Sequence, residues 1–220
     1  MTNTEIVEET IAFVKETLQG AEGGHDWFHI QRVFNNTLLI AKDEQVDVLT
    51  VSLGALLHDI ADAKFHNGDE SIGPRLAVEF LNSIDIDKKI IDHVEKIIEN
   101  ISFKNTLNKS SKKKFNSKEL QVVQDADRLD ALGAIGIARA FNYGGFKNRE
   151  LYNPEIAPNL NLTKEEYKKL EAPTINHFYE KLLLLKDKMN TKSGKVLAEK
   201  RHQFLLDYLE QFYAEWNGKA

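Results

Sequence analysis

Residues 48–62 read VLTVSLGALLHDIAD, a stretch that is apolar on nearly every side until it reaches His58 and Asp59. A helix that is hydrophobic all round belongs in a protein core, and Asp47 is placed to open it. An unpaired carboxylate in such surroundings would cost several kcal/mol or become protonated. A divalent cation removes that cost, and an imidazole can complete its coordination. This stretch therefore predicts a buried helix that ends at a metal site.

The His58-Asp59 pair also has a plainer interpretation as a simple helix end. Asp59 would then be exposed to solvent, and His58 would be a hydrogen-bonded core histidine. Two adjacent residues make a weak motif by themselves, so the choice depends on the rest of the sequence.

Helical periodicity runs through most of the chain, and strand-like alternation is almost absent. Residues 2–19 begin with a possible capping box formed by Thr2 and Glu5. Asp26 can cap a second helix that carries His29 in its first turn. Further helical patterns lie at about 74–83, 87–100, 117–143, 164–170, 174–189 and 194–216, with irregular segments at 103–118 and 142–163. The predicted fold class is all-α.

The length of 220 residues suits one core, or a core with a helical extension. The sequence contains no long linker and no internal repeat. We therefore predict a single domain over residues 1–220 with a C-terminal helical extension.

Composition excludes several function classes. The absence of cysteine removes disulfide scaffolds, thiolate zinc sites and cysteine nucleophiles, so a metal site must use His and carboxylate ligands. The formal net charge of -5 disfavours bulk nucleic-acid binding. The acidic N-terminal stretch and the lack of a long apolar run predict a cytoplasmic protein without membrane association.

Other candidate metal ligands flank the central stretch. His25 and His29 are one turn apart at the start of the second helix, so either could reach the same pocket. Downstream, QDADRLDALGAIGIAR places Asp125, Asp127 and Asp130 in an otherwise apolar helical run. Carboxylates two residues apart face different ways on a helix, so only one of Asp125 and Asp127 should point at the metal. Spacing alone does not choose between them.

The motifs together resemble the HD-domain phosphohydrolases, whose pattern is a His, a His-Asp doublet and a distant Asp. The resemblance extends over DWFHIQRV, LLHDIADAKF, DADRLDALGAIGIARAF and TINHFYEKLLLLKDKMNT, which look like one bacterial subgroup of that superfamily. It implies an HD-domain helical bundle with a divalent ion held by His29, His58, Asp59 and Asp127. Manganese is the favoured metal, and magnesium, iron or cobalt are possible.

Four further residues are candidates for catalysis or substrate binding. Asp62 follows Asp59 by three residues, so it shares the face of the helix end and could act as general base. Lys64 and Arg128 are cations near the motifs that could contact phosphate oxygens, although Arg128 could equally be a structural partner of a carboxylate. His25 could contact substrate, or it could cap the helix or hydrogen-bond to a metal-binding residue without touching the metal. His93 could extend the site to a second metal, but a lone histidine in an amphipathic helix is more often structural.

The predicted partner is a small phosphorylated molecule, most simply a nucleotide. The subgroup that this sequence resembles is associated with hydrolysis of nucleoside triphosphates to monophosphate and pyrophosphate. Alternatives are a nucleotide 5′-monophosphatase, a guanosine tetraphosphate hydrolase, and a non-catalytic nucleotide or metal sensor whose C-terminal helices contact a partner. The sequence does not predict an oligomeric state.

Overall fold

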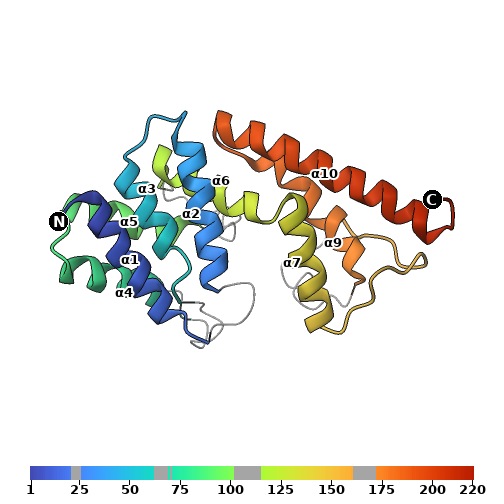
Figure 1. The fold of residues 1–220 in the computed structure, drawn as a ribbon, viewed down its shortest axis with the longest axis horizontal. Coiled ribbons are helices and arrows are strands. Elements are labelled where there is room, and N and C mark those ends of the chain that lie inside the picture. The colour runs from blue at the N-terminus through green and yellow to red at the C-terminus, as the bar shows by residue number, and fades with distance from the viewer. Residues whose placement is uncertain (21–25, 62–68, 70, 102–114, 161–171) are drawn as a thin grey trace. The chain divides into compact units, whose positions relative to one another are not determined.

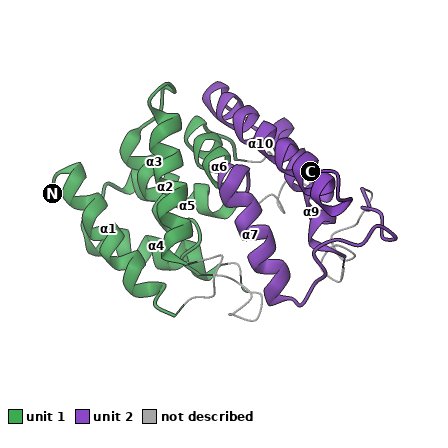
Figure 2. Cartoon of the chain, turned by 45° about the vertical axis from the view of Figure 1, so that its right-hand side comes forward, with its two compact units in different colours: residues 1–127 green, residues 128–220 purple. Residues whose placement is uncertain are grey.

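The computed structural model describes residues 1–20, 26–61, 69, 71–101, 115–160 and 172–220 (Figure 1). Within these residues the chain forms helices and no strand, which confirms the predicted all-α class. The chain divides into two compact units, residues 1–127 and residues 128–220 (Figure 2). The predicted single domain over residues 1–220 stays a prediction.

The first unit is built around the apolar helix that the sequence indicated. Helix α3 packs against α1, α2 and α5, and every residue from Leu49 to Leu57 is buried. Gly54 allows this close packing, because a Cβ there would lie 3.2 Å from the Ile97 side chain. The helices of this part are α1 (Asn3–Thr17), α2 (Trp27–Ala41), α3 (Val48–Leu57), α4 (Ile72–Ser83), α5 (Lys88–Ile101) and α6 (Lys118–Asp130), whose last turn enters the second unit.

Three predicted N-terminal caps are confirmed. Thr2 and Glu5 form a reciprocal capping box at α1. Asp26 accepts a hydrogen bond from the His29 amide at 2.9 Å, and Asp47 accepts one from the Thr50 amide at 2.7 Å. Each cap satisfies a backbone donor that has no partner inside its helix. These short polar residues therefore fix where the first three helices begin.

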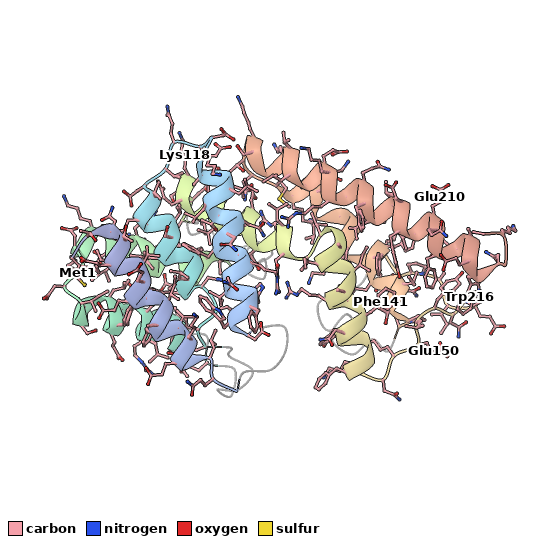
Figure 3. All side chains as sticks on the ribbon, in the orientation of Figure 1. Met1, Lys118, Phe141, Glu150, Glu210 and Trp216 are labelled. Carbon is pink, nitrogen blue, oxygen red and sulfur yellow. The ribbon has the colours of Figure 1, made fainter. Side chains whose placement is uncertain are left out.

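The second unit places helices around an aromatic cluster. Its elements are α7 (Gly133–Phe146), α9 (Thr174–Glu180), the short 3-10 helices η3 (Leu182–Leu184) and η4 (Lys186–Lys188), and α10 (Lys192–Trp216). Phe141 of α7, labelled in Figure 3, has its ring centroid 5.9 Å from that of Phe178, and Phe178 stacks on Tyr208 of α10 at 5.8 Å. Aromatic packing thus joins α7, α9 and α10.

Two predicted helices are interrupted. The run predicted at 117–143 breaks between α6 and α7, because Leu132 is extended and Gly133 has φ 68°, a left-handed conformation that glycine adopts without steric cost. The run predicted at 174–189 ends at Glu180 and continues as 3-10 helix. There Leu182 and Leu185 are both buried, and their spacing of three matches the 3-10 repeat.

The predicted irregular segment at 142–163 begins later than expected, since α7 continues to Phe146. The helix predicted at 164–170 and most of the segment 103–118 lie outside the described residues. Among the helices that the structure does describe, none combines the length and apolar character needed to span a membrane.

Candidate metal centre

Three side chains from α2 and the end of α3 converge in the first unit. His29, His58 and Asp59 each offer one ring nitrogen or carboxylate oxygen, and these atoms all lie within 4.8 Å of one another. The two imidazole rings meet edge to face, with centroids 5.4 Å apart. The cluster therefore lies where the buried helix α3 ends, as the sequence predicted.

His29 is positioned by the N-terminus of α2. It is the third residue of the helix, and its amide is tied to the Asp26 carboxylate. The residue is almost fully buried, with 3% of its surface exposed. The same cap that starts the helix therefore also fixes the backbone that carries this imidazole.

His58 is held in one tautomer by the backbone of α3. Its Nδ1 lies 2.8 Å from the carbonyl oxygen of Ala55. A carbonyl only accepts hydrogen bonds, so Nδ1 is the donor in this pair and Nε2 of the neutral ring keeps a free lone pair. A hydrogen bond of this kind orients many metal-binding histidines.

Asp127 brings a fourth functional group from α6. Its Oδ1 lies 3.6 Å from His29 Nε2 and 4.0 Å from His58 Nε2. The Asp127 side chain is 41% exposed, whereas Asp125 is fully buried. Of the two aspartates that spacing left open, Asp127 is the one that faces both imidazoles.

The chemistry of these groups fits a divalent cation. His58 Nε2 lies 4.0 Å from an Asp127 carboxylate oxygen, and a neutral imidazole nitrogen and a carboxylate oxygen can both donate electron pairs to one cation. Atoms that each lie about 2.0 to 2.3 Å from one shared ion can be at most about 4.6 Å apart, and the separations of 3.6 and 4.0 Å lie within that limit. Two imidazoles and two carboxylates suit several first-row divalent metals.

Other predicted site residues have different outcomes. His25, Asp62 and Lys64 lie outside the described residues, so their roles stay predictions. Arg128 donates from Nη1 to the carbonyl oxygen of Lys188 at 2.8 Å. This bond gives Arg128 a backbone contact within the second unit, and its predicted contact with substrate stays a prediction.

Two more polar residues that the sequence singled out, Asp130 and His93, have structural partners. Asp130 is buried and forms an ion pair with Arg139. His93 Nε2 lies 2.9 Å from Ser117 Oγ and 3.6 Å from Glu119 Oε2, and its ring meets Phe115 edge to face. These contacts favour a structural role for His93, as the simpler interpretation predicted.

One residue next to the centre was missed by sequence reasoning. Asn36 of α2 donates from Nδ2 to the carbonyl oxygen of Ala126, the residue before Asp127. The only signal in the sequence is its position seven residues after His29, which places both on one face of α2.

The fold and the cluster thus define an all-α protein with a His and Asp site of metal-binding type. Residues 27–132 match the HD domain family. The chain is 36% identical to the protein YpgQ of Bacillus subtilis, across 96% of this chain and 94% of the relative. The chain belongs to the HD-domain superfamily.

Solved structures agree with this assignment. An HD-superfamily hydrolase from Bacillus thuringiensis is 41% identical, with a TM-score of 0.78 over 98% of this chain and 99% of that one. Bacillus subtilis YpgQ in complex with ADP gives a TM-score of 0.76 at 34% identity, over 98% and 97% of the two chains.

Proposed function

We propose that this protein is a metal-dependent phosphohydrolase that converts nucleoside triphosphates to the monophosphate and pyrophosphate. The observation that carries the proposal is the cluster of His29, His58 and Asp59, together with the Asp127 carboxylate that faces both imidazoles. Family membership and the hydrolase among the similar structures support the general class.

A nucleotide is the substrate class that we favour. YpgQ, which resembles this chain over nearly its whole length, has been solved with ADP. The net charge of -5 gives no general attraction for phosphates, so a local cation must supply it. A bound metal ion would do so at the His and Asp centre.

In this proposal His29, His58, Asp59 and Asp127 hold the cation, and manganese is the favoured ion. When bound, such a cation supplies Lewis acidity that activates water and polarises a phosphoryl oxygen. The fixed Nδ1 donor of His58 keeps its Nε2 lone pair directed at the centre.

The remaining roles rest on sequence position. We assign Asp62 as the base that accepts the proton of the attacking water, because it follows Asp59 by three residues. Lys64, Arg128 and His25 are assigned to the substrate, the two cations at phosphate oxygens that the metal does not contact.

The test is incubation of the purified full chain with nucleoside mono-, di- and triphosphates and manganese, with phosphate and pyrophosphate followed separately. We expect pyrophosphate from triphosphates and none from a variant carrying both His58→Ala and Asp59→Ala. A His93→Gln variant is the matched control, because His93 contacts Ser117 and Glu119 instead of the cluster.

Other outcomes identify the alternatives. Phosphate release from monophosphates would replace the proposal with a nucleotide 5′-monophosphatase, and turnover of guanosine tetraphosphate alone would make the protein an alarmone hydrolase. Nucleotide binding without turnover in the presence of manganese would indicate a sensor.

A further inference from the structure

Helices α2 and α6 meet at two points beside the candidate metal centre. At the first, His29 Nε2 faces Asp127 Oδ1 at 3.6 Å. At the second, Asn36 Nδ2 donates to the carbonyl oxygen of Ala126 at 3.3 Å. That carbonyl belongs to the peptide group that joins Ala126 to Asp127, so the hydrogen bond acts on the backbone from which the Asp127 side chain projects.

The second contact is buried, and it lies on the same face of α2 as His29. Asn36 is 7% exposed and Ala126 is fully buried. Asn36 follows His29 by two helical turns on the same face of α2. A buried amide loses its bonds to water, so a hydrogen bond across two helices at such a site fixes their relative placement.

The rotation of α6 about its axis decides which aspartate reaches the imidazoles. With 3.6 residues per turn, residues two apart project roughly 160° from each other. Asp125 is fully buried, while Asp127 faces His29 and His58. A change in the rotation of α6 would therefore withdraw the Asp127 carboxylate from the cluster.

We propose that Asn36 is a positioning residue of the metal centre, which holds α6 in the rotation that presents Asp127 to the two imidazoles. The inference rests on the proposed metal site and deepens it. Asn36 acts through Asp127, and it does not itself contact the cation.

Loss of the Asn36 amide should leave a folded chain. Carbonyls inside an α-helix already accept from the amide four residues on, so the Ala126 carbonyl does not depend on Asn36. Leucine is close to asparagine in size and keeps the position filled. Asn36→Leu therefore tests the placement of Asp127 more than the survival of the fold.

The experiment is titration calorimetry of Mn²⁺ into the metal-stripped full chain. We expect Asn36→Leu to bind Mn²⁺ about 10- to 100-fold more weakly than wild type, the range typical for residues that orient metal ligands. Asn176→Leu is the matched control, because Asn176 is also buried and donates to a carbonyl, that of Ile156, at 3.0 Å in the second unit. The control should keep wild-type affinity.

A double-mutant cycle separates positioning from a general loss of stability. In an Asp127→Ala background, Asn36→Leu should weaken Mn²⁺ binding no further, because its effect passes through Asp127. Equal weakening in both backgrounds would overturn the proposal. If Asn36→Leu fails to fold, Asn36→Ala serves in its place, since alanine also cannot donate to the Ala126 carbonyl and adds neither bulk nor charge.

Failure of the role of Asn36 and failure of the metal site give different results. Wild-type affinity in Asn36→Leu would overturn the role of Asn36 and leave the metal site standing. Failure of the wild-type chain to bind Mn²⁺ would overturn both.

Discussion

His177 should make the second unit less stable in mild acid. Burial, together with the positive charges of Lys181 and Arg149, lowers the pKa of His177 from 6.5 to about 3. Its ring therefore stays neutral in the folded protein at pH values where it becomes charged in the unfolded chain. The unfolded chain binds the extra proton, so the free energy of unfolding falls as the pH drops below 6.5.

The size of the effect follows from the ordinary pKa of the unfolded state. Between about pH 7.5 and about pH 5, protonation of an unfolded histidine favours unfolding by about 2 kcal/mol. The folded state offsets almost none of this, provided that the folded pKa of His177 stays well below 5. The prediction therefore does not depend on the exact depth of the shift.

The assay uses the two tryptophans of the chain. Trp27 lies in α2, and Trp216, labelled in Figure 3, lies at the end of α10. In a Trp27→Phe background, the fluorescence of Trp216 reports urea unfolding of the unit that contains His177. The ring of Trp216 lies 5.0 Å from that of Tyr152, so its surroundings change on unfolding.

The comparison is between this protein and the same protein with His177→Gln, which cannot titrate. From about pH 7.5 to about pH 5, the free energy of unfolding should fall by about 2 kcal/mol more in the histidine form than in the glutamine form. If the two proteins lose the same unfolding free energy over this pH range, to within about 0.5 kcal/mol, the assigned burial and charge environment of His177 is wrong.

Three further predictions concern helix α7, a helix cap and the metal. Gly136→Ala should lower the free energy of unfolding in urea by about 3 kcal/mol or more, because the new Cβ would clash with the carbonyl of Ala131. The control is Gly145→Ala, which has open space around it and should be neutral or stabilising. Asp47→Ala should cost about 1 kcal/mol, since it removes the cap on the Thr50 amide, and an unchanged urea midpoint would contradict this. Manganese at about 100 times its Kd should stabilise the wild type by about 2.7 kcal/mol in thermal unfolding, a gain that a chelator reverses and that His58→Ala lacks.

Much of the first unit could be predicted because its signals are local. Thr2, Asp26 and Asp47 each accept from an amide three residues ahead, so a short sequence window contains the whole cap. The all-apolar run before His58 likewise predicted a central buried helix, and every residue from Leu49 to Leu57 is buried.

The features that were missed depend on contacts distant in sequence. Nothing within the run 117–143 shows that Gly133 adopts a left-handed conformation, where a Cβ would lie 3.2 Å from the Arg201 side chain. Asn36 lies 90 residues from its acceptor Ala126. The choice of Asp127 over Asp125, which spacing left open and the family resemblance made, depends on how α6 meets α2. The spacing of residues along the sequence does not predict contacts between such distant pairs.

The most direct test of the central claim is pyrophosphate release from a nucleoside triphosphate by metal-stripped protein before and after manganese is restored. We expect no release from the stripped chain, release once manganese is added, and none in either state for a variant with His58→Ala and Asp59→Ala. Undiminished release in the presence of a chelator, or no turnover of any nucleotide after manganese is restored, would contradict it.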